Sequence, residues 1–256
     1  MRWRSYVAVG DSFSEGMDDP YPDGTYRGWA DLVATRLAAE AGPDFGYANL
    51  AIRGKLFGHV VENQVPVALE MKPDLISFAA GGNDALRPGG LDIPAIGRRL
   101  DTVVARMRAT GADVVLFRYA NVMARLPGNR WVTPKVIEMN TVVGEAAEKH
   151  GAILVDLYSD DTYLNPALWG PDRLHLSPVG HRRVAAQVLT ALGVGCDEEW
   201  LLVPPHPEPT PWLSARTADL RWAGKHLAPW LKRRLTGRSS GDTVTAKRPT
   251  LGPMAQ

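Results

Sequence analysis

The chain has 256 residues, 45% of them hydrophobic and 22% charged, which is the ordinary composition of a globular protein with a sizeable core. Its 29 basic and 28 acidic residues leave a formal net charge of +1, so no global field favours nucleic acid or an anionic membrane as a partner. The single cysteine, Cys196, excludes an internal disulfide and a thiolate metal cluster.

The beginning of the chain carries only a short apolar segment before Gly10, without the long apolar stretch and small-residue cleavage site of a secretory signal. No apolar run approaches the roughly 20 residues that are needed to span a bilayer. These two features predict a cytoplasmic location.

Short apolar runs in the first three quarters of the chain are predicted to be β-strands. In chain order they are SYVAVG (5–10), YANLA (47–51), DLISFAAGG (74–82), DVVLFRYA (113–120) and AILVDLY (152–158). Their near-continuous apolar character is typical of strands in a sheet that is covered by helices on both faces. We therefore predict a central, mostly five-stranded parallel sheet.

Longer segments with helical spacing separate and follow these strands. They are Trp29–Ala41, Gly58–Met71, Ile93–Ala109, Pro134–His150 and Pro178–Leu192. Pro134 and Pro178 suit first helical turns, because the N–H that proline lacks is unpaired there in any case. The alternation of strands and helices predicts an α/β fold in three layers, in which ligands bind at the carboxyl ends of the strands.

The composition changes near Asp197, where we place a domain boundary. We predict a main domain over residues 1–196, then a Pro-rich connector and an amphipathic helical extension over residues 197–235. Residues 236–256 are rich in Gly, Ser, Thr and Pro, which predicts a disordered tail whose removal is harmless.

Tryptophans and basic residues alternate in the helical part of the extension, residues 212–235. Such a helix can lie in a lipid headgroup layer. We favour the other interpretation, in which it packs on the main domain or on a second subunit, because apolar helix faces are usually buried. The oligomeric state stays open.

A serine follows the first predicted strand in the sequence GDS, at the edge of the sheet where ligands bind. A serine hydroxyl becomes a nucleophile when a base takes its proton and a third group orients that base. The segment PDRLHLS, before the last helix, offers Asp172 and His175 three positions apart. The sequence therefore predicts Ser12 as nucleophile, His175 as base and Asp172 as the orienting carboxylate.

Attack by such a serine on an acyl carbon creates an oxyanion that needs fixed hydrogen-bond donors. The candidates are the backbone N–H groups of Ser12 and Gly54 and the side-chain amide of Asn83, each at a different strand end. Asp11 and Asp84 flank these residues and are expected to support their loops through side-chain to backbone hydrogen bonds. The other five histidines are interpreted as structural.

With these motifs the chain resembles the SGNH hydrolases, also called GDSL-type esterases and lipases. The resemblance rests on GDSFSEG near the start, Gly54, GGND at 81–84 and DRLHLSPVGH at 172–181. It covers about Ser5 to Leu192, has Phe13 where the family usually has leucine, and does not explain the tail. It implies a flavodoxin-like sheet and hydrolysis of carboxylic esters without a metal or organic cofactor.

The resemblance places the family's four named residues at Ser12, Gly54, Asn83 and His175, with Asp172 completing the triad. An acyltransferase that uses the same residues stays open, because pocket shape decides which acceptor resolves the acyl-enzyme. A metal-dependent phosphoesterase and a noncatalytic binding module are weaker alternatives. Small acyl or acetyl esters, and lipid esters, are the candidate substrates.

Predicted loops around these residues, which are expected to shape the substrate pocket, mix aromatic, proline and polar residues. They cover residues 17–29, 86–95, 121–131 and 161–172. They do not predict a long apolar tunnel, and they leave the acyl chain and the alcohol of the substrate undetermined.

Overall fold

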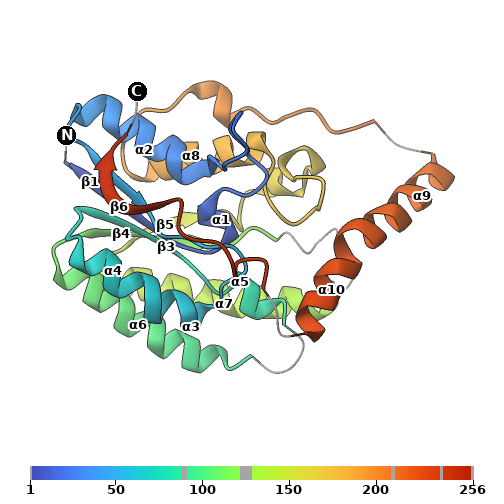
Figure 1. Ribbon diagram of the computed structural model, residues 1–256, viewed down its shortest axis with the longest axis horizontal. Coiled ribbons are helices and arrows are strands. Elements are labelled where there is room, and N and C mark those ends of the chain that lie inside the picture. Colours follow the sequence, from blue (N-terminus) through green and yellow to red (C-terminus); the bar gives the residue numbers. More distant parts are fainter. Residues whose placement is uncertain (1, 88–90, 122–128, 209–210, 237–238, 255–256) are drawn as a thin grey trace.

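A computed structural model describes residues 2–87, 91–121, 129–208, 211–236 and 239–254 (Figure 1). These residues contain a six-stranded sheet with the order β5-β4-β3-β1-β2-β6. The strands are β1 Ser5–Gly10, β2 Gly46–Asn49, β3 Leu75–Ala79, β4 Asp113–Arg118, β5 Ile153–Asp156 and β6 Arg248–Pro253. Strands β1 to β5 pair in parallel, and β6 pairs antiparallel with β2. The predicted α/β class and parallel sheet are confirmed, with one strand added.

Helices cover both faces of the sheet, which gives the three predicted layers (Figure 1). Helices α2 and α8 pack together on one face, and α3, α4, α6 and α7 cover the other. The described helices of the main domain are α1 Ser12–Glu15, α2 Gly28–Ala41, α3 Phe57–His59, the π-helix η1 Val60–Gln64, α4 Val65–Glu70, α5 Gly82–Ala85, α6 Ile93–Ala109, α7 Asn129–His150, the 3₁₀-helices η3 Asp161–Leu164 and η4 Pro166–Leu168, and α8 Pro178–Ala191.

Strand β1 shows why its sequence is apolar almost throughout. Successive side chains of a strand point to opposite faces. Tyr6 and Ala8 join the core beneath α2 and α8, whereas Val7 and Val9 join the core on the other face. All four are fully buried. Burial on both faces is therefore why β1 is apolar at successive positions. The strand ends at Gly10, at the carboxyl edge of the sheet.

Helix α7 begins at Asn129 and contains Pro134, so the prediction that Pro134 starts this helix is wrong. A proline inside a helix removes one backbone hydrogen bond, here the bond to the carbonyl of Arg130. Arg130 is exposed, so water can satisfy that carbonyl and the helix extends beyond the proline.

The segment after α8 leaves the main domain, runs down one side of the molecule and returns to the sheet as β6 (Figure 1). We call residues 197–254 the C-terminal segment. Its helices are η5 Glu198–Leu201, α9 Trp212–Trp222, the π-helix η6 Ala223–Leu227 and α10 Ala228–Leu235. The last three follow one another directly, and we call them the C-terminal helix. The boundary at residues 196 and 197 stays a prediction.

The predicted disorder of residues 236–256 is wrong for strand β6 and for residues 239–247, which precede it. Strand β2 would otherwise be an edge with unpaired N–H and C=O groups, and β6 pairs with it. The Lys247 ammonium lies 2.8 Å from a carboxylate oxygen of Asp31 in α2 and donates to two backbone carbonyls. Strands β2 and β6 lie far apart in the sequence, so their pairing leaves no periodic pattern of apolar residues near either strand. The composition of residues 236–256 alone therefore predicted disorder.

The C-terminal helix presents two different faces. Trp212, Leu213 and Leu220 are 69%, 72% and 74% exposed, whereas Trp222 and Leu227 are half-buried on the side of the main domain. Packing on the main domain therefore accounts for one face. What covers the exposed face, a membrane surface or a second subunit, stays a prediction. Within the described ranges, no helix is long and apolar enough to cross a membrane.

Candidate active site

Strand β1 ends at a point where the chain turns directly into the short helix α1, and Ser12 is the first residue of that helix. Asp11 caps the helix by accepting a hydrogen bond from the Phe13 N–H at 3.1 Å. Gln64, from the π-helix η1, accepts from the Gly10 N–H at 2.7 Å and donates to its carbonyl at 2.9 Å. The serine is thus held at the carboxyl edge of the sheet by bonds on both sides.

Ser12 belongs to a chain of hydrogen bonds that includes both other residues of the predicted triad. His175 Nε2 lies 2.9 Å from Ser12 Oγ, and His175 Nδ1 lies 2.5 Å from Asp172 Oδ2. The other oxygen of Asp172 accepts from the backbone N–H groups of Leu174 and His175, both at 2.9 Å. An ionised carboxylate only accepts, so Nδ1 donates to Asp172 and Nε2 is left to accept from the serine hydroxyl.

The surroundings of His175 strengthen its basicity. Burial by itself lowers the pKa of the imidazole, but the hydrogen bond and charge of Asp172 outweigh it and raise that pKa above its usual value. The charges of Asp18 and Asp11 add to the rise. For Asp172, burial raises the pKa, and the hydrogen bonds from His175 and the backbone overcome it, so the pKa lies well below its usual range.

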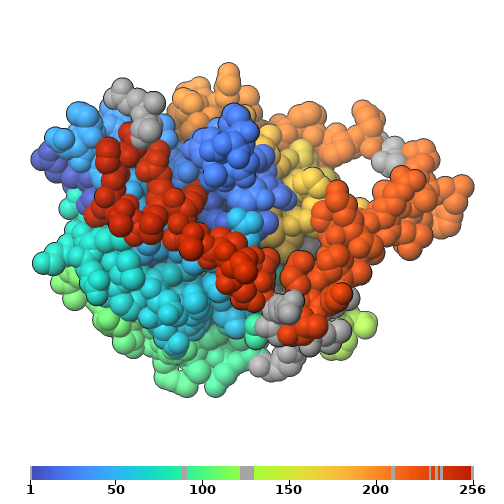
Figure 2. All heavy atoms as spheres, viewed as in Figure 1, coloured from blue at the N-terminus to red at the C-terminus, as the bar shows by residue number. Residues whose placement is uncertain are grey.

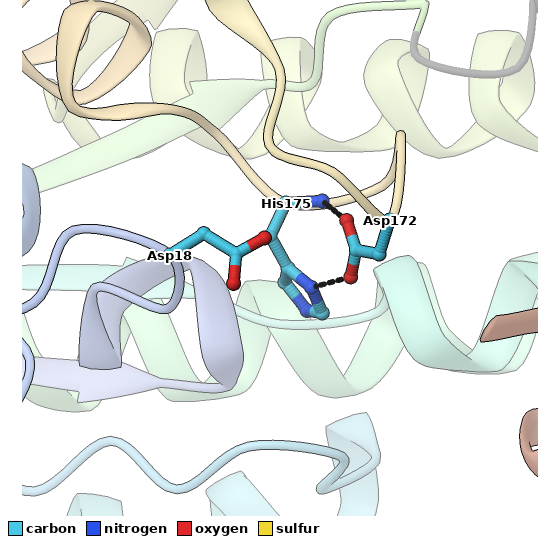
Figure 3. Close-up of side chains that lie close together, drawn as sticks. All are labelled: Asp18, Asp172 and His175. Carbon is cyan, nitrogen blue, oxygen red and sulfur yellow. Dashed lines mark hydrogen bonds and ion pairs between the residues drawn. The ribbon is translucent and has the colours of Figure 1, made fainter. Parts of the chain in front are cut away.

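Asp18 was not singled out by the sequence, yet its carboxylate lies beside the imidazole. The carboxyl groups of Asp18 and Asp172 flank the His175 ring in Figure 3, and one polar atom from each of the three residues lies within 4.8 Å of the others. Asp18 has a left-handed backbone with φ of 66°, and burial raises the pKa of its carboxyl. No short motif marks a loop residue of this kind.

The two predicted backbone donors of the oxyanion hole have no acceptor within the described part of the chain. These are the N–H groups of Ser12 and Gly54. Gly54 has φ of 72°, a conformation that favours glycine, and a Cβ there would require the Ser239 hydroxyl to move. Glu15 holds the neighbouring residue, Arg53, through its backbone N–H at 2.6 Å and through its guanidinium.

Asn83, the third predicted donor, lies at the start of α5 beside the same cavity. Its side-chain nitrogen is 3.0 Å from Asp11 Oδ2 and 3.2 Å from the Lys55 carbonyl. Asp84 accepts from the Phe57 N–H at 2.9 Å. Asp11 and Asp84 thus make the side-chain to backbone bonds that the sequence predicted. Burial raises the pKa of Asp11 to about 6, while its hydrogen bonds act in the opposite direction.

Two cavities meet at Ser12 and His175. The large cavity has a volume of about 530 Å³. Part of its wall is formed by the C-terminal helix together with Ser239 and Ser240. The space-filling view shows the C-terminal helix, orange to red, along the side of the molecule (Figure 2). The small cavity, of about 130 Å³, lies beyond the carboxyl ends of β1, β4 and β5 and is mostly apolar. Of the predicted pocket loops, residues 88–90 and 122–128 lie outside the described residues.

Two further histidines lie near the site. His226 lines the large cavity, a position that the helical pattern around it did not indicate, and its interpretation as structural stays a prediction. His181 is buried, donates to the Met17 carbonyl from Nε2 and accepts from the Trp29 N–H at Nδ1. Burial lowers its pKa to about 4. His181 is therefore a neutral residue that connects α8 to the loop after Ser12.

Asp18, Asp172 and His175 are also the one group in the described ranges with the number and spacing of ligand atoms for a metal ion. Both ring nitrogens of His175 already have partners, Asp172 and Ser12. A dinuclear site requires more ligands than these residues offer. This donor set fits a hydrogen-bonded serine, histidine and aspartate better than a metal centre.

Comparison with known proteins identifies the family. The model of the GDSL-like lipase/acylhydrolase family matches residues 8–183. This chain belongs to that family. Esterase TesA of Pseudomonas aeruginosa is 28% identical over 192 residues, which cover 74% of this chain and 88% of that protein. The chain is a carboxylic ester hydrolase, as its sequence predicted.

Solved structures of GDSL-family and related enzymes share the fold. The crystal structure of TesA has a TM-score of 0.57 and 27% identity, and the match covers 73% of this chain and 97% of that one. LAE5, an alpha/beta hydrolase enzyme from the metagenome of Lake Arreo in Spain, has a TM-score of 0.61 and 22% identity, with 74% and 95% covered. The family match ends before the C-terminal segment begins.

Proposed function

We propose that this GDSL-family enzyme hydrolyses small carboxylic esters through an acyl-enzyme formed on Ser12, with His175 as base and Asp172 as its orienting partner. The observation that carries the proposal is the continuous chain of hydrogen bonds from Ser12 Oγ through His175 to Asp172, at a point where two cavities meet. The alcohol and the acyl group of an ester can occupy one cavity each.

In the first step Ser12 Oγ attacks the carbonyl carbon of the ester while its proton passes to His175 Nε2. The carbonyl oxygen becomes negatively charged and accepts hydrogen bonds from the N–H groups of Ser12 and Gly54. It also accepts from the Asn83 amide, which gives up one of its bonds to Asp11 or to the Lys55 carbonyl for this purpose. His175 then gives its proton to the departing alcohol, which leaves an acyl group on Ser12. Water repeats the sequence and releases the acid.

Asp172 keeps the imidazole in the tautomer that this sequence needs, and it stabilises the imidazolium that forms after proton transfer. The depressed pKa of Asp172 keeps it ionised across the working pH range. The raised pKa of His175 makes the ring a stronger base, at the expense of a larger protonated fraction in mildly acidic solution.

The small cavity supports a short acyl group. Apolar side chains line most of it, among them Phe13, Tyr119, Val136 and Met139. Its volume of about 130 Å³ is close to the roughly 150 Å³ of an engineered protein cavity that binds benzene. An acyl group of up to about six carbons is therefore the best fit on this scale, and a long lipid chain is a poor one.

The large cavity supports a bulkier and more polar alcohol. Its volume of about 530 Å³ is ordinary for a binding site of a drug-sized molecule. Trp222 and Trp230 give it aromatic surface, Lys225 and Arg233 give it positive charge, and the His226 ring adds polar nitrogen atoms.

The cellular location of the enzyme is a separate question. We propose that it is cytoplasmic, as its sequence predicted. Fractionation of cells followed by detection of the enzyme tests this.

A series of p-nitrophenyl esters from acetyl to dodecanoyl tests the proposed acyl group. We expect kcat/KM to be highest for chains of up to about six carbons and to fall for longer ones. Val136→Phe should move the optimum toward acetyl, whereas Ile137→Phe, at an exposed position of the same helix, should leave it in place. An optimum at dodecanoyl in the unmodified enzyme would contradict the proposal.

Two alternatives are tested on the same p-nitrophenyl esters. One is transfer of the acyl group to an alcohol other than water, and the other is a mechanism that depends on a metal ion. Released acid as the main product, with and without added glycerol, supports hydrolysis, whereas a glycerol ester as the main product indicates an acyltransferase. Activity that survives dialysis against a chelator supports the serine mechanism, and its loss, with recovery on adding metal, contradicts it.

A further inference from the structure

The C-terminal helix touches the loop that carries the proposed base. Trp222 Nε1 donates a 2.9 Å hydrogen bond to the backbone carbonyl of Asp172. Asp172 is also the residue whose side chain holds His175. One side chain from outside the family match therefore contacts the main chain of a residue of the proposed triad.

Arg173, the next residue, is held by the same helix. Its guanidinium lies 2.8 Å from Asp219 Oδ1 and stacks over the Trp222 ring at 4.9 Å from the ring centroid. Its φ of 64° is in the left-handed region, which residues with a Cβ adopt at an energetic cost. Contacts from the C-terminal helix thus converge on the strained residue of this loop.

The conformation of Arg173 and the direction of the Asp172 carbonyl are linked, because both depend on the peptide unit between the two residues. If Arg173 relaxes to a negative φ, this peptide rotates and its carbonyl turns away. The carboxylate of Asp172 is then displaced from His175. The hydrogen bond from Trp222 favours the orientation in which Asp172 and His175 meet.

We propose that Trp222 and Asp219 are positioning residues, which hold the loop of residues 170–175 in the conformation that joins Asp172 to His175. The inference rests on the proposed function of Ser12, His175 and Asp172. It assigns to the C-terminal helix a part in catalysis beyond forming a cavity wall. Neither residue touches the reacting atoms, so both act through Asp172 and Arg173.

Trp222→Phe tests this directly, because phenylalanine keeps an aromatic ring near Arg173 and lacks the N–H. Loss of a single hydrogen bond of this kind changes the equilibrium constant between the correct and the relaxed loop conformation by about fivefold. We expect kcat to fall by up to about fivefold, with a smaller change in KM. Trp212→Phe, on the exposed face of the same helix, is the matched control and should behave as the unmodified enzyme.

The pH profile separates positioning from a general loss of structure. When Asp172 no longer contacts His175, the pKa of the imidazole loses its main source of increase. The midpoint of kcat/KM against pH should therefore move to lower pH in Trp222→Phe and stay in place in Trp212→Phe. An unchanged kcat together with an unchanged midpoint in Trp222→Phe would overturn the inference.

The ion pair gives a second test that does not depend on the folding of the Trp222 variant. Arg173→Glu and Asp219→Arg should each lower kcat, and the double variant should recover most of the loss because the pair is restored with its charges exchanged. Absence of recovery in a folded double variant contradicts a positioning role for Asp219. Labelling of Ser12 by a fluorophosphonate in the unmodified enzyme separates failure of this inference from failure of the proposed function.

Discussion

The main domain and the C-terminal segment are built in different ways. Helix α2 of the main domain buries eight of its 14 residues, whereas α9 has no buried residue. The C-terminal segment is held by separate polar contacts, such as those of Trp222 and Lys247, by the pairing of β6 with β2, and by a few apolar side chains that pack on the core, among them Trp200 and Leu251. The difference teaches that the chemistry depends on a packed core, while the surroundings of the site depend on a few contacts that can be removed one at a time.

This comparison leads to distinct expectations for variants. Changes at strand ends of the main domain should remove activity and leave stability almost unchanged, because the core does not depend on those side chains. Changes in the C-terminal segment should alter stability, pH dependence or substrate range. Changes at Trp222 or Asp219 should also lower kcat, but far less than loss of a triad side chain does, because Ser12, His175 and Asp172 are all still present.

Ser12→Ala should lower kcat by more than about 10⁴-fold, because loss of a nucleophilic serine in a comparable triad costs about 2 × 10⁶. The thermal unfolding midpoint should not change. Ser14→Ala is the matched control, since the Ser14 hydroxyl is buried without a hydrogen-bond partner in the described part of the chain and lies in the same helix. If the Ser12→Ala protein were as active as the Ser14→Ala protein, Ser12 would not be the nucleophile.

Asn83→Ala should lower kcat by about 100-fold or more with a smaller change in KM, because its amide is proposed to bind the charge that develops in the transition state. Steady-state kinetics on p-nitrophenyl acetate measure both constants. Asn63→Ala, at an exposed position, serves as the control. If KM alone changes, Asn83 binds substrate and the oxyanion hole consists of the two backbone donors.

Lys247→Ala should destabilise the fold by about 3 kcal/mol, because it leaves the buried Asp31 carboxylate without its cationic partner. For a chain of this size each kcal/mol lowers the unfolding midpoint by about 2–4 °C. Calorimetry measures the shift, with the exposed Lys232→Ala as control. An unchanged midpoint would mean that the contact of Lys247 with Asp31 contributes nothing to stability, as the disorder predicted for residues 236–256 had implied.

Asp18→Asn should have the smallest effect, a shift of the pH profile. Because His175 has a raised pKa, kcat/KM of the unmodified enzyme should reach half of its maximum above the usual histidine value of about 6.5. The Asp18 charge contributes to that rise, so its removal should move the midpoint to lower pH. Profiles measured from pH 5 to pH 9 decide this, and a shift to higher pH would contradict the electrostatic account.

The sequence was sufficient to predict the location of site residues that directly follow a strand. Ser12 follows β1 and Asn83 follows β3, and parallel strands bring their carboxyl ends to one edge. Asp172 and His175 lie three positions apart, so their contact is almost local. The short range of these relations is why simple motifs located the predicted site.

The sequence was insufficient where a contact joins distant parts of the chain. The pairing of β6 with β2 and the contact of Lys247 with Asp31 each bring together residues about 200 positions apart, and neither leaves a periodic pattern. Asp18 lies beside His175 through a left-handed turn of a loop, which no motif announces. His226 faces the large cavity only because the whole C-terminal helix is placed there.

The most direct test of the central claim is the site and rate of covalent labelling by a fluorophosphonate, followed by intact mass measurement and peptide mapping. The account predicts one added group on Ser12, formed faster as pH rises through the pKa of His175, strongly slowed in His175→Ala and absent in Ser12→Ala. Labelling at another residue, or undiminished labelling of the Ser12→Ala protein, would contradict it.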